Sequence, residues 1–299
     1  MLLFKKMELD DIETVRPFFK YAKNRLCDYS VGGTVMWRNT FNIHFTIYKD
    51  TLIMRQSYIN DEIFFVPPIG ENPEEALEQV RIWCATKDIP VRLCVLSETD
   101  LAWLPNPDLW KIRETEHWGD YLYPAEQLAT LKGRNLAGQR NHINFFVKTW
   151  PDYRTEKIDE GNMGGVRDLL DKYRREISKD SQLFVDEILG DEEVIENFDS
   201  YGFLGLCLIA DGKVVAYAMG EVVGDTLHVH IEKADRSYRG AYQMIVREFA
   251  RTYAVDGVKY INREDDSGDD GLRQSKLSYH PSEILRKYVA EYTGHNPLL

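Results

Sequence analysis

The chain has 299 residues, of which 43% are hydrophobic and 29% are charged, a composition typical of a folded globular protein. Its net charge of −12 disfavours binding along a nucleic-acid backbone, because phosphate contacts need a basic surface. The longest nearly unbroken apolar run, residues 203–210, is far shorter than the roughly 20 residues of a membrane-spanning helix, and the N-terminus lacks the apolar core of a signal peptide. We therefore expect a cytoplasmic protein without a membrane span.

The elements predicted for the first half follow the order helix, three strands, helix, two strands. The alternation of Ile43, Phe45 and Ile47 indicates the first strand. Pro73 favours a helix beginning there, because proline is tolerated in a first turn. The predicted ranges are a helix over 10–22 that Pro17 interrupts, strands over 43–47, 52–58 and 63–66, a helix from residue 73, and strands over 91–96 and 110–116. We assign them to an N-terminal domain of residues 1–120.

Residues 121–150 are predicted to connect the two halves through a helix that starts at Pro124 and a long helix over 134–149. Five basic side chains lie in this segment with no acidic residue among them: Lys132, Arg134, Arg140, His142 and Lys148. They indicate either a solvated helix face balanced by neighbouring acids or a local nucleic-acid-binding surface.

The second half gives clearer signals. Val166, Leu169, Leu170 and Tyr173 recur at helical spacing, and Asp211-Gly212 is a typical hairpin turn pair. The predicted order is helix, helix, three antiparallel strands, helix, strand, helix, strand. The ranges are 164–177, 186–198, 203–210, 214–223, 226–233, 241–253, 258–262, 272–277 and 285–292. This is the layout of the GNAT acyltransferase fold, and the first half repeats it.

We therefore predict an α/β protein with two tandem GNAT-like domains, the second over residues 151–299. Each domain is expected to hold a mixed, largely antiparallel sheet flanked by helices. The four cysteines show no CxxC spacing and lie beside apolar residues, so we expect buried thiols in a reducing compartment and no zinc site.

The densest polar stretch is the segment 262–281, NREDDSGDDGLRQSKLSYHP, which begins where a buried strand is predicted to end. Ligand sites of open α/β sheets lie at such strand ends. Acidic residues alternate here with arginine and lysine, which favours a functional site over a solvated acidic loop. The spacing excludes an EF-hand, because counting from Asp266 puts Gly268 and Leu277 at two ligand positions. No metal site is expected.

A second candidate is the segment 232–243, EKADRSYRGAYQ, at the junction between the third strand and the next helix. In acyl-CoA transferases a glycine-rich turn at this junction binds pyrophosphate through backbone N–H groups. Here only Gly240 is present, followed by Ala241, and the spacing from Arg236 or Arg239 does not match the phosphate-binding pattern. Gly240 and Ala241 are the candidate cofactor-binding residues, and acetyl-CoA or another acyl-CoA is disfavoured as a cofactor.

Glu232 ends the third strand of the second half. In a regular strand it shares a face with His228 and His230, and a carboxylate at a strand end beside a cleft can take a proton from an amine. A salt bridge from Glu232 to Arg239 is the alternative.

Four segments in this order resemble a bacterial family related to the C-terminal domain of phosphatidylglycerol lysyltransferases. They are CDYSVGGTVMWR, YLYPAEQLATLKGRNLAGQRNHINFF, EKADRSYRGAYQ and INREDDSGDDGLRQSKLSYHP. The resemblance implies a tandem GNAT-like fold shared with Fem-type aminoacyltransferases, which move an aminoacyl group from aminoacyl-tRNA to a lipid head group or a peptide amine. The chain departs from the lysyltransferases in lacking a membrane-spanning portion, and its acidic charge is unusual for a protein that uses tRNA.

We predict an acyl- or aminoacyltransferase acting on an amine or hydroxyl, with a small-molecule or aminoacyl donor such as aminoacyl-tRNA. The alternative is a non-catalytic GNAT-like module that binds an amino acid or aminoacylated ligand. The expected catalytic residues are Glu232, Asp265 and Lys276, as base or amine anchor and as oxyanion stabiliser. The expected substrate-binding residues are Arg239, Asn262, Arg263, Glu264, Asp266, Arg273 and Tyr279, the arginines binding carboxylate or phosphate. Glu232, Arg239, Asn262, Asp265, Arg273 and Lys276 are expected to converge on one cleft.

Overall fold

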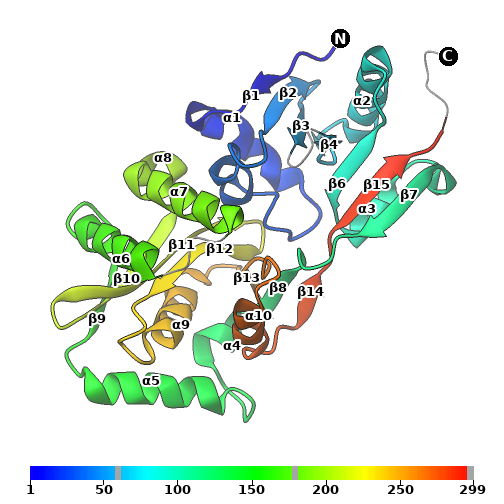
Figure 1. Cartoon of the computed structure of the whole chain (residues 1–299). Helices are drawn as coiled ribbons and strands as arrows, with labels where there is room; N and C mark the ends of the chain where they lie inside the picture. Colours follow the sequence, from blue (N-terminus) through cyan, green and yellow to red (C-terminus); the bar gives the residue numbers. More distant parts are fainter. Residues whose placement is uncertain (58–61, 177–180, 295–299) are drawn as a thin grey trace. The chain divides into compact units, whose positions relative to one another are not determined.

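The computed structural model describes residues 1–57, 62–176 and 181–294 (Figure 1). The chain forms two compact units, Met1–Gly119 with Leu285–Leu299 (unit 1) and Asp120–Ile284 (unit 2). These units differ from the predicted domains at two places. The connecting segment 121–150 is part of unit 2, and the C-terminal residues return to unit 1, because strands from both regions pair there.

Unit 1 contains, among its described residues, an eight-stranded sheet in the order β1-β2-β3-β4-β6-β15-β7, with β5 beside β3. The strands are β1 Lys5–Lys6, β2 His44–Tyr48, β3 Thr51–Ser57, β4 Ile63–Phe65, β5 Ile69–Gly70, β6 Arg92–Leu96, β7 Trp110–Glu114 and β15 Tyr288–Tyr292. The pairing of β4 with β6 is parallel, whereas β15 runs antiparallel to both β6 and β7. The sheet is therefore mixed and largely antiparallel, as predicted.

The helices of unit 1 are α1 Ile12–Val15, α2 Pro73–Lys87 and α3 Glu98–Trp103. The helix predicted over 10–22 is interrupted at Pro17, as expected. A 3₁₀ helix, Arg16–Tyr21, follows α1 there, because proline lacks the N–H that continues an α-helix. Helix α2 buries one face, including Leu77 and Val80, in the core of the unit. The four cysteines of the chain are buried and form no disulfide, as expected.

Unit 2 contains a seven-stranded sheet in the order β14-β8-β13-β12-β11-β10-β9 within its described residues. The strands are β8 Asp120–Pro124, β9 Arg154–Lys157, β10 Leu204–Ala210, β11 Lys213–Val223, β12 Thr226–Ala234, β13 Tyr260–Asn262 and β14 Glu283–Leu285. Strands β9 to β12 form an antiparallel meander, and β12 then pairs with β13 in parallel.

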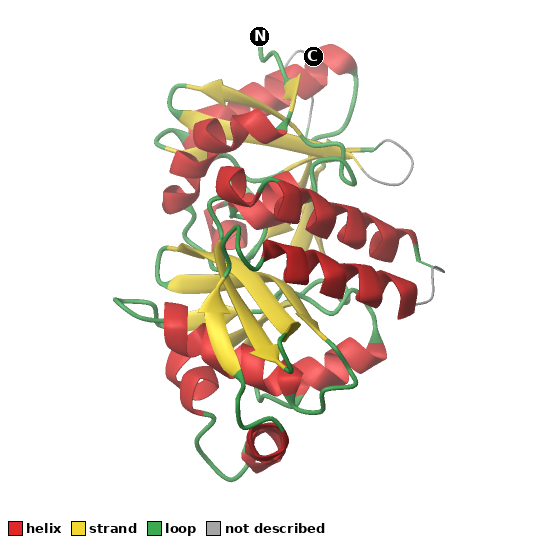
Figure 2. Cartoon of the chain, turned by 90° about the vertical axis from the view of Figure 1, so that its left-hand side faces the viewer, coloured by secondary structure: helices red, strands yellow, loops and turns green. Residues whose placement is uncertain are grey.

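Helices cover both faces of this second sheet (Figure 2). They are α4 Ala125–Thr130, α5 Ala137–Thr149, α6 Met163–Glu176, α7 Gln182–Glu196, α8 Phe198–Tyr201, α9 Ala241–Tyr253 and α10 Asp270–Leu277. Helix α9 packs on β10, β11 and β12 and buries Ile245 and Phe249, whereas α6 packs on β11 and β12. Within the described parts of the chain, no helix is both long and apolar enough to cross a lipid bilayer.

Strand β12 contains a β-bulge that reverses which side chains face α9. Met219 pairs with Ile231 and Gly220 pairs with Val229, so His230 is one extra residue on β12. Before the bulge, Val229 lies in the core with α9, which puts His230 on the opposite face. After the bulge, Glu232 faces Tyr242 of α9. The expectation that Glu232 shares a face with His228 and His230 is therefore wrong, because the strand is not regular.

Gly220 makes this bulge sterically feasible, and Gly220→Ala is expected to destabilise the protein. A Cβ at this position would lie 2.0 Å from the carbonyl oxygen of His228. We expect a loss of about 1–3 kcal/mol in the free energy of unfolding, as for other overpacked sites. Urea denaturation measures it, with Gly138→Ala on α5 as the control. A Cβ at Gly138 meets nothing within 4 Å, so that variant should be unchanged or slightly stabilised; equal losses would contradict the steric argument.

Candidate active site

The candidate site lies where β12 and β13 separate. Their parallel pairing runs from Thr226 opposite Tyr260 to His228 opposite Asn262, and β13 ends there. Strand β12 continues to Ala234 without β13 beside it. The site residues predicted from the sequence therefore lie at or beyond the point where these two parallel strands separate.

A buried ion pair spans this divergence. The Nε and Nη2 atoms of Arg263 donate to Oε2 of Glu232 at 2.9 and 2.6 Å, and the two side chains are only 1% and 10% exposed. The guanidinium lies 4.8 Å from the ring centroid of Tyr279 and 5.9 Å from those of Tyr123 and Tyr242. Burial lowers the pKa of Arg263, but the Glu232 carboxylate outweighs this and holds the pKa above its usual range. The guanidinium is therefore charged, and it is enclosed by aromatic rings.

Two hydrogen-bond donors beside this pair have no protein partner among the described residues. They are Nη1 of Arg263 and the hydroxyl of Tyr279, both buried. Tyr279 is 1% exposed, and burial raises the pKa of its hydroxyl well above the ordinary value, so the hydroxyl keeps its proton. Buried donors of this kind normally find an acceptor. The arrangement suits an oxygen of a ligand that carries partial or full negative charge.

A second buried cluster lies on the opposite face of β12, around His230. Its Nδ1 is 2.7 Å from Oε1 of Glu264, and its Nε2 is 3.1 Å from Oε1 of Glu221. Burial lowers the pKa of His230, but the two carboxylates raise it to about 9. The ring stacks on Phe203 and His228, with centroid distances of 5.2 and 6.2 Å. His230 is therefore an imidazolium that donates to both carboxylates, and Glu264 is held by it.

The charge on His230 makes a pH-dependent stability prediction. A pKa raised from 6.5 to about 9 adds stability that is fully present below pH 6.5 and is lost as the pH rises through about 9. Since one pKa unit corresponds to about 1.4 kcal/mol, the contribution is about 3 kcal/mol. The difference in unfolding free energy between the intact protein and His230→Gln should therefore shrink from pH 6 to pH 10. Groups that do not contact His230 titrate alike in both proteins and cancel, so a difference that stays constant over this range would contradict a charged imidazole.

The loop after Asn262 is fixed by its own charged side chains. The ammonium of Lys276, which is buried, donates to the backbone carbonyls of Arg263 and Asp265. Burial lowers the pKa of Lys276. Asp266 accepts hydrogen bonds from Arg273 at 3.0 Å and from the Tyr121 hydroxyl at 2.6 Å. These contacts hold the loop over the end of β13.

Asp265 and Asn262 have local partners. Oδ1 of Asp265 accepts from the backbone N–H of Ser267 at 2.8 Å. Asn262 is fully buried, accepts from the N–H of Glu264 at 2.7 Å and donates to Asp120 at 2.8 Å. Arg263 thus contacts both Glu232 and Tyr279, whereas Glu264 lies on the other face of β12 with His230.

The predicted cofactor-binding residues lie in a different environment. Arg239 is exposed, and its guanidinium lies 4.7 Å from the Phe145 ring of α5, so Arg263 rather than Arg239 is the ion-pair partner of Glu232. A Cβ at Gly240 would lie 2.3 Å from the carbonyl oxygen of His142, so this glycine allows α5 to pack closely on the start of α9. Ala241 is buried in the core.

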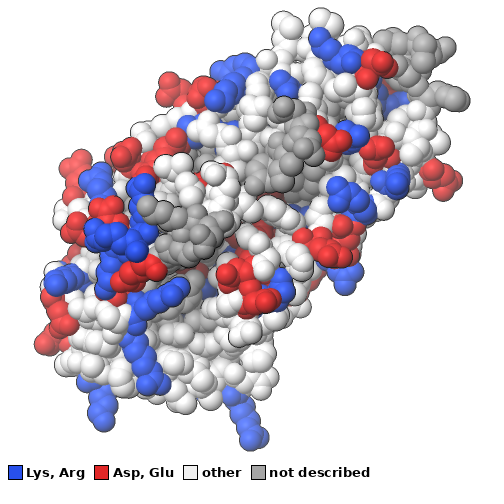
Figure 3. All heavy atoms as spheres, viewed as in Figure 1, with Lys and Arg blue, Asp and Glu red and all other residues white. Residues whose placement is uncertain are grey.

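The basic segment 132–148 has partners of its own. The ammonium of Lys132 is 3.5 Å from Glu126, and Arg140 donates to the carbonyl of Gly133 at 2.7 Å. On the face shown in Figure 3, acidic and basic side chains are interspersed over much of the surface, whereas the lower edge carries basic side chains without acidic ones beside them. Lys132 is thus paired with an acidic side chain, whereas Arg140 is held by a backbone carbonyl.

Sequence reasoning did not assign a role to Tyr123, Tyr242 or Glu221. Tyr242 lies three residues after Arg239, within the segment 232–243. Its aromatic ring was the signal that could have indicated a wall of the site. Tyr123 belongs to β8, a strand that was predicted as a connection. Glu221 is a carboxylate inside an otherwise apolar strand, and that position was an indication of a buried partner.

Comparisons with known proteins agree with this fold. A conserved protein of unknown function from Bacteroides thetaiotaomicron is 31% identical, with a TM-score of 0.89 over 98% of this chain and all of that one. The L-PGS structure from Bacillus licheniformis is 12% identical, with a TM-score of 0.67 over 100% of this chain and 95% of that one. An uncharacterised protein of Mycoplasmoides gallisepticum is 26% identical over 66% of this chain, and the match spans 63% of that protein's length.

The predicted α/β fold, with two mixed sheets flanked by helices, is confirmed by the two sheets of the structure, and the likeness to the L-PGS structure shows that the two chains share a fold. Residues 19–291, which include most of both units, match the family described as "Phosphatidylglycerol lysyltransferase, C-terminal". The chain belongs to this phosphatidylglycerol lysyltransferase C-terminal family.

Proposed function

We propose that the chain transfers an aminoacyl group from an activated donor to an amine or hydroxyl acceptor. The observation that carries the proposal is the family match over residues 19–291, since the family takes its name from an enzyme that transfers a lysyl group to a lipid. Aminoacyl-tRNA is the donor class that this membership favours.

The site supplies groups suited to such a transfer. The acceptor attacks the carbonyl carbon of the donor ester, a new C–N or C–O bond forms, and the ester bond to the donor hydroxyl breaks. Negative charge develops on the acyl oxygen during attack, and donors already in position stabilise it. In this proposal, Nη1 of Arg263 and the hydroxyl of Tyr279 bind that oxygen, while Glu232 orients the guanidinium.

Other residues have narrower roles in the proposal. Lys276 supports the loop and does not bind the acyl oxygen, because its ammonium is engaged by two backbone carbonyls. Asp265, in the same loop, takes the proton from the acceptor as general base and returns it to the hydroxyl of the donor as that hydroxyl leaves. Acyl-CoA remains disfavoured as the donor, because Gly240 packs against the His142 carbonyl at the start of α9.

A transfer assay tests the proposal. The purified full chain is incubated with tRNA charged with radiolabelled amino acids, in separate reactions with phosphatidylglycerol vesicles and with a panel of water-soluble amines. Movement of the label from tRNA to any of these acceptors is the expected result. Charged tRNA that keeps its label in every reaction, apart from spontaneous hydrolysis, would overturn the proposal.

A further inference from the structure

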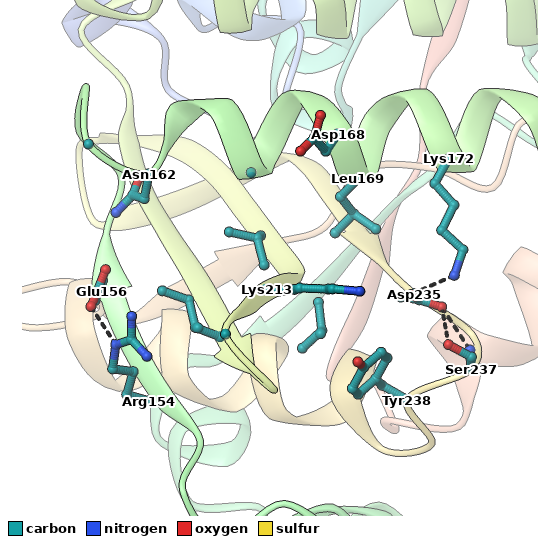
Figure 4. Close-up of a pocket in the computed structure, with 16 residues that line it drawn as sticks. Arg154, Glu156, Asn162, Asp168, Leu169, Lys172, Lys213, Asp235, Ser237 and Tyr238 are labelled. Atoms are coloured by element: carbon teal, nitrogen blue, oxygen red, sulfur yellow. Dashed lines mark hydrogen bonds and ion pairs between the residues drawn. The ribbon is translucent and has the colours of Figure 1, made fainter.

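Unit 2 contains a pocket that lies apart from the residues discussed above. Its volume is about 630 Å³, within the range of small-molecule sites, and its walls come from β9, the β10–β11 hairpin, α6 and the loop after β12 (Figure 4). None of the residues predicted from the sequence as site residues lines it. The pocket is therefore a separate candidate binding site.

The floor of the pocket is apolar and one wall is aromatic. Leu169 of α6 and Ile209 and Val215 of the hairpin contribute aliphatic side chains that are otherwise buried. The ring of Tyr238 is fixed at the side, since its hydroxyl is 3.2 Å from Asp211 and its centroid is 4.9 Å from that of Trp150. A ligand with an apolar body would cover this floor.

The rim of the pocket carries three cationic and three anionic side chains, of which four are paired with one another. Lys172 is 2.6 Å from Asp235, and Arg154 is 2.6 Å from Glu156. The remaining two, Lys213 on β11 and Asp168 on α6, have no ion-pair partner among the residues that the structure describes. They lie on different walls of the pocket (Figure 4). The pocket thus offers one free cation and one free anion on either side of an apolar floor.

We propose that this pocket binds a small zwitterion, with an ammonium group on Asp168 and a carboxylate on Lys213. The apolar floor takes an aliphatic body between the two charges, and the volume suits a molecule of about the size of a dipeptide. A purely anionic ligand would leave Asp168 without a partner, and a purely cationic ligand would leave Lys213 without one. The proposal does not depend on the transfer reaction.

Titration of leucyl-leucine into the full-length protein, followed by calorimetry and ligand-observed NMR, tests the proposal. The N-acetylated dipeptide lacks the ammonium group and the C-terminal amide lacks the carboxylate. Each is expected to bind about tenfold more weakly or worse, the size of a hydrogen bond to a charged group.

Two variants test whether Asp168 binds the ammonium group of the ligand and Lys213 its carboxylate. Asp168→Asn should lower the affinity for leucyl-leucine to that of the N-acetylated dipeptide, and it should not change the affinity for the N-acetylated dipeptide itself. Lys213→Met should lower the affinity for leucyl-leucine to that of the C-terminal amide, and it should not change the affinity for the amide itself. Asp171→Asn, on the same helix and exposed but outside the pocket, is the matched control and should bind normally. Melting temperatures of all variants check that they are folded.

Three results would overturn the proposal. The first is no saturable binding of leucyl-leucine at millimolar concentration. The second is equal affinity for the dipeptide and its two analogues, which would show that the charges are not recognised. The third is binding that Asp168→Asn and Lys213→Met leave unchanged, or that Asp171→Asn weakens equally.

Discussion

Glu232→Gln is expected to lower the free energy of unfolding by about 3–5 kcal/mol, because it leaves the guanidinium of Arg263 buried without its counter-charge. The side chain of Arg263 is 1% exposed, so water cannot replace the lost carboxylate. Three tyrosine rings surround the guanidinium, and they stabilise a cation less than an ion pair does. Urea denaturation at neutral pH, with circular dichroism as the signal, measures the change.

A double variant and an exposed pair make this test specific. Replacing both partners, as Glu232→Leu with Arg263→Met, should recover much of the lost stability, since two apolar side chains leave no unpaired charge. Glu126→Gln removes the partner of Lys132 in a pair whose side chains are 80% and 77% exposed, and it should have no measurable effect. A double variant as unstable as the single one would show that volume, rather than charge, dominates at this position.

Tyr279→Phe is expected to reduce aminoacyl transfer by about 100-fold or more while leaving stability unchanged, as for the loss of one donor to a developing oxyanion. The hydroxyl has no hydrogen-bond partner in the described part of the chain, so its removal breaks no bond within the protein. The transfer assay and a melting curve on the same preparation separate the two effects.

Tyr217→Phe is the matched control for this prediction. Tyr217 is also fully buried, and its hydroxyl likewise lacks a partner among the described residues. It lies on β11 opposite Lys233, whose ammonium contacts Asp191 of α7 at 3.1 Å, away from Arg263. Tyr217→Phe should leave transfer intact. Equal losses in both variants would indicate a general effect of removing a buried hydroxyl.

The sequence predicted the elements with strong periodicity and some short strands, such as β4 and β13, but missed others. Helix α9 was predicted with the observed bounds, because Ile245, Phe249 and Tyr253 recur every four residues. Strands β8 and β9 were not predicted. Strand β9 contains no apolar residue, and β8 ends in a proline that was interpreted as a helix start. Their pairing is decided by distant partners, which local patterns do not report.

The sequence predicted which residues belong to the candidate site better than it predicted the contacts between them. The loop after Asn262 does gather charged residues at the end of a buried strand, as the sequence indicated. The ion pair of Glu232 with Arg263 was not predicted, because the bulge at His230 turns Glu232 to the other face. Gly220, an isolated glycine in the neighbouring strand, was the available signal of that bulge. Lys276 was expected to face a ligand, yet it faces backbone carbonyls, since a local pattern does not distinguish a lysine that folds inward.

The position of β15 has a consequence for the order in which the two units fold during synthesis on the ribosome. This strand lies between β6 and β7, yet its residues are synthesised after all of unit 2. Domains generally fold as they emerge, N-terminal first. Here the contiguous segment Asp120–Ile284 can complete its sheet during translation, whereas β6 and β7 await a strand that emerges last. The N-terminal part of this protein is thus begun first and finished last, with two sheet edges open in the interval.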